Sequence, residues 1–119
     1  MCVRGASALQ TVLGQQPRPD LSVFVVWEPI LFSDLAPPTT AALARISDPR
    51  ATQFWDPGHL VAAELIRSGQ VQASSERPAW DLVAIYPPGV RWETTLPAPV
   101  FQAVPVVAGM AEVRERLRK

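Results

Sequence analysis

The chain has only one cysteine, one histidine and one lysine among its 119 residues. The single cysteine, Cys2, excludes an internal disulfide. The single histidine, His59, has one acid close to it in the sequence, Asp56, whereas structural zinc usually takes four ligands. We therefore predict no metal site and no cofactor, and we interpret His59 as a polar surface or capping residue.

A charge excess and a long apolar run are also missing. The 11 basic and 11 acidic residues cancel, and a neutral chain gives no electrostatic attraction to nucleic acid or to an anionic membrane. No run of about 18 apolar residues is present, so we expect no membrane span. The N-terminus has neither the basic flank nor the apolar stretch of a signal peptide, which favours a cytoplasmic location.

Proline, by contrast, is abundant, with 13 residues that fall mostly in short clusters. Proline fixes φ and lacks an amide donor, so these clusters mark loops and the ends of elements. Hydrophobic residues make up 48% of the chain, which is ordinary for a globular protein. The length indicates one domain over residues 1–119, built from short elements with stiff connections.

The first half of the chain alternates helical and strand patterns. Apolar residues at three- and four-residue spacing predict a helix over 2–15. The nearly continuous apolar run "LSVFVVW", residues 21–27, is typical of a parallel strand buried on both faces. A short helix is expected within 37–46 and a short strand over 50–55. Residues 56–69 carry helix signals: Asp56 for the N-cap, Pro57 for the first helical position and Gly69 for the stop.

The second half predicts a hairpin and a terminal helix. In "WDLVAIYPPGVRWETT", residues 80–95, two strand-like runs flank Pro88 and Gly89, which suit the centre of a type II turn. Met110, Val113 and Leu117 recur at helical spacing near the C-terminus. Strands mixed with helices, then a hairpin and a last helix, indicate a three-layer α/β domain.

This order of elements resembles the thioredoxin fold entered just after its first core strand. "CVRGASALQ" is similar to the second cysteine of the Cys-x-x-Cys motif and its helix, "LSVFVVWEP" to the next parallel strand, and "RPAWDLVAIYPPGVRWE" to the closing hairpin. "ARISDPRATQFWDPGHLV" resembles a stretch of uncharacterised bacterial thioredoxin-like proteins. The resemblance implies thiol–disulfide chemistry, with Cys2 as the resolving cysteine, Pro78 as the cis-proline of the substrate groove, and a protein or small-molecule disulfide as the partner.

One strand and one cysteine of that family are missing. The family's first strand lies mid-sheet, between the counterparts of 21–27 and 80–86. Buried amides without partners cost about 1–3 kcal/mol each, so such a gap must be closed. The two runs pair directly, another chain supplies the strand, or the sequence is a fragment whose start lies upstream. We favour the fragment, an N-terminally truncated mixed sheet with flanking helices, and expect this chain to be inactive in disulfide reduction by itself.

Two alternatives stay open. The first is a non-catalytic thioredoxin-like interaction module that binds a polypeptide through the apolar loop 29–35 or an open strand edge. The second is a catalytic pocket of unknown type within 50–80, for which Asp56 and His59 are the residues to test.

The four tryptophans are interpreted as packing residues at the core or its edge, not as a stacking platform for sugars or bases. Trp55 is expected to be the most exposed of the four. The other three are Trp27, Trp80 and Trp92.

Overall fold

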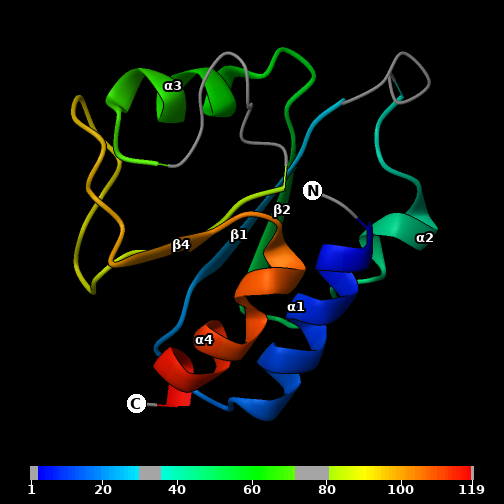
Figure 1. Ribbon diagram of the computed structural model, residues 1–119. Coiled ribbons are helices and arrows are strands. Elements are labelled where there is room, and N and C mark those ends of the chain that lie inside the picture. The colour runs from blue at the N-terminus through cyan, green and yellow to red at the C-terminus, as the bar shows by residue number, and fades with distance from the viewer. Residues whose placement is uncertain (1–2, 30–35, 72–80, 119) are drawn as a thin grey trace.

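The computed structural model describes residues 3–29, 36–71 and 81–118, and these contain four helices and four strands in mixed order (Figure 1). Cys2, Pro78 and most of the 29–35 loop lie outside the described residues. The order confirms the α/β class. The elements are α1 (Val3–Gln15), β1 (Val23–Trp27), α2 (Thr40–Leu43), β2 (Ala51–Trp55), α3 (Leu60–Ser68), β3 (Val83–Ile85), β4 (Phe101–Ala103) and α4 (Val106–Arg118).

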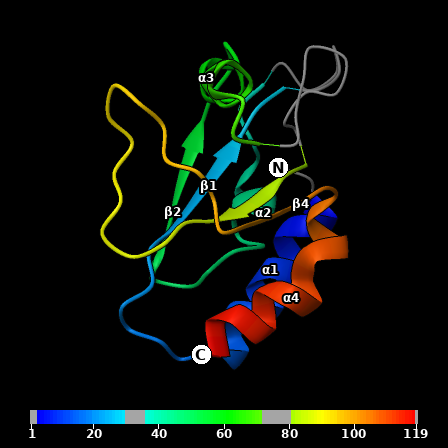
Figure 2. The same ribbon diagram turned by 60° about the vertical axis from the view of Figure 1, so that its left-hand side comes forward.

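β1 and β2 form a parallel pair, which confirms the strand predicted over 50–55. Val25 and Trp27 of β1 are buried, but Phe24 is 69% exposed and its ring lies 6.3 Å from that of Phe54. The prediction that 21–27 is buried on both faces is therefore wrong. The face that carries Phe24 is exposed because no helix in the described part of the chain packs on it. α1 and α4 lie on one side of the pair, and α3 lies beyond the strand ends (Figures 1 and 2).

β3 and β4 form the predicted hairpin with a different second strand. The turn at Pro88 and Gly89 is present, and Gly89 has the positive φ of 82° that only glycine adopts easily. However, Ile85 is opposite Phe101, so the prediction of the second strand within 90–95 is wrong. Residues 90–95 are exposed, whereas Phe101 is half-buried against the core, so burial decides which segment pairs.

The two strand pairs are separate sheets, and β1 does not pair with β3. Direct pairing of 21–27 with 80–86, one of the three arrangements considered above, is therefore not the one that the described residues adopt. The expectation that the runs 21–27 and 80–86 belong to one sheet is also wrong for the residues that the structure describes. The cause is that each strand finds its partner within its own half of the chain, β1 with β2 and β3 with β4.

The two longest helices join these sheets into one core. α1 and α4 pack side by side, and both views show them on the same side of the strands (Figures 1 and 2). No helix in the described ranges is long and apolar enough to cross a membrane. The apolar stripes predicted for both helices face inward, except that Val3 at the start of α1 is 41% exposed. The buried cluster comprises Ala6, Leu9, Val12 and Leu13 of α1, Val25 and Trp27 of β1, Ile46, and Val106, Met110, Val113 and Leu117 of α4.

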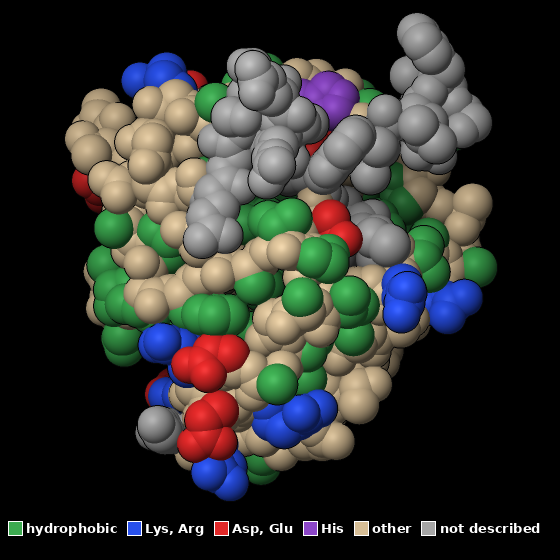
Figure 3. Space-filling view, in the orientation of Figure 1, with side chains coloured by type: hydrophobic (Ala, Val, Ile, Leu, Met, Phe, Trp, Pro, Cys, Tyr) green, Lys and Arg blue, Asp and Glu red, His purple; other side chains and the backbone are tan. Residues whose placement is uncertain are grey.

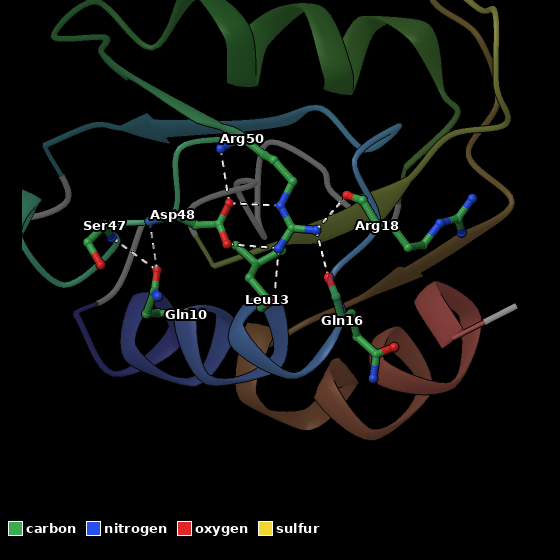
Figure 4. A network of polar contacts seen from close by, with 7 residues as sticks. All are labelled: Gln10, Leu13, Gln16, Arg18, Ser47, Asp48 and Arg50. Atoms are coloured by element: carbon green, nitrogen blue, oxygen red, sulfur yellow. Dashed lines mark hydrogen bonds and ion pairs between the residues drawn. The ribbon is translucent and has the colours of Figure 1, made fainter.

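A partly buried arginine connects the end of α1 to the start of β2. Arg50 donates two bonds to the carboxylate of Asp48 and three to the backbone carbonyls of Leu13, Gln16 and Arg18, at 2.6–2.8 Å (Figure 4). All five guanidinium N–H groups are thus used. Gln10 of α1 accepts bonds from the amides of the same turn as Asp48. The network joins the turn after α1 to the turn before β2, and it adds to backbone bonds that the carbonyls of Leu13 and Gln16 already accept.

Candidate functional site

The carboxyl ends of β1 and β2 bring two acidic residues together. Glu28 directly follows β1 and Asp56 directly follows β2. Parallel strands end at the same edge, and the amide of Asp56 donates to the carbonyl of Trp27 at 2.7 Å. In α/β sheets this edge is where ligands usually bind. His59 lies three residues further on, so the edge gathers two carboxyl groups and the only imidazole of the chain.

Asp56 has a structural role, because both of its carboxylate oxygens are occupied. Oδ1 accepts from the amide of Leu60 at 3.0 Å, and Oδ2 accepts from the amide of Val61 at 2.9 Å. The prediction that Asp56 is the N-cap residue is wrong, since the N-cap is His59, although the Asp56 carboxylate does accept from the first two amides of the helix. The helix begins at Leu60 and not at Pro57, because a turn over 57–58 intervenes.

His59 adopts the left-handed backbone conformation, with φ of 54°. A side chain other than glycine is uncommon there, although histidine tolerates it better than most. Gly58 stands one position earlier without a positive φ, so the strained conformation falls on the histidine and not on the glycine. This backbone brings Nδ1 of His59 to 3.4 Å from Oε2 of Glu28, while the side chain stays 48% exposed. Figure 3 shows the histidine at the molecular surface with acidic atoms beside it.

Glu28 is the buried partner in this pair. Its side chain is only 5% exposed, and its second oxygen, Oε1, is buried with no hydrogen-bond partner among the described residues. Burial raises the pKa of Glu28 above its ordinary value; the nearby Asp56 raises it further, and His59 lowers it. A buried carboxylate without full hydrogen bonding is costly to a fold. Folding stability alone therefore gives no reason for a glutamate at this position.

The arrangement can hold and transfer a proton. A buried carboxylate that contacts one ring nitrogen fixes the orientation of an imidazole. Among the described contacts Nε2 of His59 has no hydrogen bond, and the side chain as a whole is 48% exposed. Asp56, bonded to the helix amides, holds the loop that carries His59.

Sequence reasoning identified Asp56 and His59 but gave no role to Glu28. The signal that points to Glu28 is its position directly after a buried parallel strand, at the same edge as Asp56. The contact between Glu28 and His59 requires the left-handed conformation of His59, and no residue pattern in the sequence predicts that conformation. The interpretation of His59 as a surface or capping residue is therefore incomplete, because the side chain is at the surface and also contacts a buried acid.

The remaining predicted site residues are not brought together in the described structure. Cys2 and Pro78 lie outside it, so neither the thiol nor the proposed cis-proline is placed. The cis peptide bond that is described joins Val104 to Pro105, ahead of α4. Within the described ranges no group of three or more His, Cys, Asp and Glu side chains is arranged to hold a metal.

The tryptophans also differ from expectation. Trp27 is 5% exposed and donates through Nε1 to Gln53, which confirms its role as a core residue. Among the three tryptophans that the structure describes, Trp92 and not Trp55 is the exposed one, at 46%, because it lies in the loop between β3 and β4. Its ring meets that of Tyr86 edge-on, with the centroids 5.8 Å apart. Trp80 lies outside the described residues.

Comparisons with protein families, with curated proteins and with solved structures find no match to this chain.

Proposed function

We propose that this chain is a thioredoxin-like module related to thiol–disulfide chemistry, located in the cytoplasm, where thiols stay reduced. The element order supports this proposal: a helix directly after the cysteine, a strand, and a hairpin followed by a last helix. The packing of α1 beside α4 supports it as well, since both helices cover the same side of the strands.

The observation that carries the proposal is the start of α1. This helix begins at Val3, directly after Cys2 in the sequence, and its first turn has no acidic residue and includes Arg4. Free amides, the helix dipole and a neighbouring cation all favour a thiolate over a thiol. α1 precedes β1 and runs against it, so its N-terminus points toward the edge that carries Glu28 and His59 (Figures 1 and 2).

With one cysteine the chemistry is limited to monothiol exchange. The Cys2 thiolate attacks one sulfur of a disulfide, the S–S bond of the substrate breaks, and a mixed disulfide forms while the second sulfur leaves and takes up a proton. A second thiol from outside the chain reverses the step. Pro78 is proposed to shape the groove for the disulfide. Net reduction of a protein disulfide needs a resolving partner, so we expect none from this chain alone.

Glutathione disulfide tests the proposal, with the mass of the mixed disulfide as the readout. The control is Cys2→Ser combined with Thr11→Cys, which moves the thiol to an exposed position in the interior of α1. We expect Cys2 to react about fivefold faster at neutral pH than the moved thiol, because only the helix start favours the thiolate. Equal rates would refute the proposal. An insulin reduction assay on the unmodified chain should show no turnover.

A second candidate, an interaction module without catalysis, is favoured by the uncovered face of the β1–β2 pair. Phe24 and Phe54 are 69% and 48% exposed on that face, and their rings lie near each other. Exposed apolar patches often mark binding surfaces for other polypeptides. Phe24→Thr with Phe54→Thr should abolish binding to a polypeptide partner without changing the reactivity of Cys2. Loss of thiol reactivity in this variant would argue against separate roles.

A further inference from the structure

Glu28 and His59 form a contact that the fold maintains at a cost. The Glu28 side chain is only 5% exposed, and its Oε1 has no hydrogen-bond partner among the described residues. His59 holds a left-handed backbone conformation with φ of 54°, although a glycine, Gly58, stands directly before it. Strained residues that persist in a fold cluster at active sites, ligand clamps and switch regions. The contact is therefore a candidate for a conformational switch.

His59 connects the buried carboxylate to the start of α3. Its Nδ1 lies 3.4 Å from Oε2 of Glu28, and its side chain is 48% exposed, so the imidazole is the exposed partner of a buried acid. His59 is also the N-cap residue of α3, and its carbonyl accepts from the amide of Ala63 at 2.9 Å. A change in the position of His59 therefore changes the first turn of the helix.

The main core does not depend on α3. The buried residues of this helix, Ala62 and Leu65, are not among the described members of the cluster that α1, α4 and β1 share. α3 lies beyond the ends of β1 and β2 (Figures 1 and 2). After its C-terminal end, the carbonyl of Gln70 accepts from Nε2 of Gln102 in β4 at 3.1 Å. The first turn of α3 can therefore shift while the core stays packed and the far end stays attached.

Burial opposes the ionisation of Glu28 in this arrangement. A buried carboxylate with one oxygen unbonded costs more than the neutral acid in the same place. Burial accordingly raises the pKa of Glu28; His59 and the positive charge of the chain's N-terminus lower it, and Asp56 raises it. Both oxygens of Asp56 are already bonded to amides of α3. As the pH rises through the folded-state pKa of Glu28, the closed arrangement loses stability relative to one in which water reaches the carboxylate.

We propose that ionisation of Glu28 releases His59 and the first turn of α3 from the carboxyl ends of β1 and β2. In mildly acidic solution the protonated Glu28 tolerates burial, and the start of α3 is closed over it. Toward neutral pH the charged carboxylate is hydrated, the imidazole moves aside, and the left-handed conformation of His59 relaxes. The edge where parallel sheets usually bind ligands is then open. This switch involves no thiol and does not depend on the proposed function.

Amide hydrogen exchange of the full chain, followed by NMR between pH 4 and 7 and corrected for the intrinsic exchange rate, tests this inference. The reporters are the amides of Leu60 and Val61, which are bonded to Asp56 at 3.0 and 2.9 Å. An N-terminal amine keeps its charge over this range. We expect the protection of both reporters to fall about tenfold between pH 4 and 7, and at pH 7 to be lower than that of amides within α1.

Two variants of Glu28 and one control assign the effect. Glu28→Gln removes the charge and keeps the size of the side chain, and Glu28→Met does the same if the glutamine amide is not accommodated. Both should keep the protection of Leu60 and Val61 constant over the pH range. Glu64→Gln is the matched control, because Glu64 is an exposed acid on α3 that pairs with Arg67. It should show the same pH dependence as the unmodified chain.

Three results would overturn the inference. The first is constant protection of the reporters in the unmodified chain. The second is a fall that persists in both Glu28 variants, because another group then controls the start of α3. The third is reporters that are as well protected at pH 7 as the amides of α1, because the helix then opens only when the whole chain unfolds.

Discussion

At the scale of single residues, the partly buried Asp48 and the buried Glu28 differ in what surrounds them. Asp48 shares its carboxylate with Arg50, which lowers the pKa of Asp48 to about 2. Glu28 has an imidazole at 3.4 Å and a second oxygen with no partner in the described part of the chain, and burial raises the pKa of Glu28. The first arrangement is fully bonded and stabilises a helix end. The second is partly bonded and open to solvent through His59, which is the pattern of a site.

Arg50→Lys tests the value of the fully bonded arrangement. Lysine presents one point charge and cannot reach the Asp48 carboxylate and three separate carbonyls together. We expect a loss of about 1–3 kcal/mol in the free energy of unfolding, because lysine loses the two-point bond to Asp48 and most of the charge-assisted bonds to part-buried carbonyls. Chemical denaturation measures it. Arg67→Lys, at an exposed pair with Glu64, should change stability by less than about 0.5 kcal/mol, and a similar loss there would contradict this reasoning.

Neither arrangement could be predicted from residue patterns. In the sequence, Arg50 is one of 11 basic residues, and the carbonyls it bonds lie more than 30 positions away. Glu28 has an apolar strand before it and proline after it, which indicates an element end and no more. Asp56 was predictable because its partners lie four and five residues further along the same chain segment. Local partners leave a signal in the sequence, and distant ones do not.

At the scale of elements, the helices were predicted more accurately than the strand partners. Helical spacing places Leu9, Val12 and Leu13 on one stripe of α1, whichever elements pack against the helix, and all three are buried. Strand pairing is a choice among distant segments, and the segment 90–95 satisfied the local hairpin pattern while Phe101 offered more burial. The apolar run of β1 was a correct strand signal, but its outer face depends on whether any element covers it.

Glycines in α1 and α4 give a paired prediction at this scale. A Cβ at Gly109 would lie 2.6 Å from the Cβ of Ala103 and 3.1 Å from Cγ1 of Val83, so α4 sits directly on the hairpin. Gly109→Ala should therefore destabilise the fold by about 1–3 kcal/mol despite the better helix propensity of alanine. Gly14→Ala in α1, with nothing within 4 Å, should stabilise it by up to about 1 kcal/mol.

Denaturant unfolding of both glycine variants measures this difference. Opposite signs for the two substitutions support close packing of α4 on β3 and β4. A stabilising Gly109→Ala would show that the helix stands further from the hairpin than the structure has it.

At the scale of the whole molecule, two separate strand pairs share one core. α1 and α4 span both pairs, since residues of each helix belong to the same buried cluster as Val25 and Trp27, and Val83 and Phe101 pack against it. The α/β class followed from the element order, because helix and strand signals are local. The division into two sheets could not be predicted from the element order, because it depends on which strands pair with each other.

The buried acids also predict how the stability of the whole molecule depends on pH. The folded-state pKa of Asp48 is about 2, below the ordinary 3.8, so the stability it contributes is complete above about pH 4 and is lost as the pH falls to 2. That loss is about 2 kcal/mol. Glu28 acts in the opposite sense: its folded-state pKa lies above the ordinary 4.5, so the folded state is favoured below that pH and loses stability as the pH rises through the folded-state pKa.

These two dependences place the stability maximum in mildly acidic solution and not at neutral pH. Free energies of unfolding from urea titrations between pH 2 and 8 measure the curve. Glu28→Gln should remove the decline on the neutral side and leave the acid side unchanged, whereas Asp48→Asn should lower the maximum and flatten the acid side, because its amide cannot carry the charge that Arg50 pairs with. If the free energy of unfolding of Glu28→Gln still falls between mildly acidic and neutral pH, ionisation of Glu28 is not what destabilises the folded chain. The reason for assigning Glu28 a functional role would then be gone.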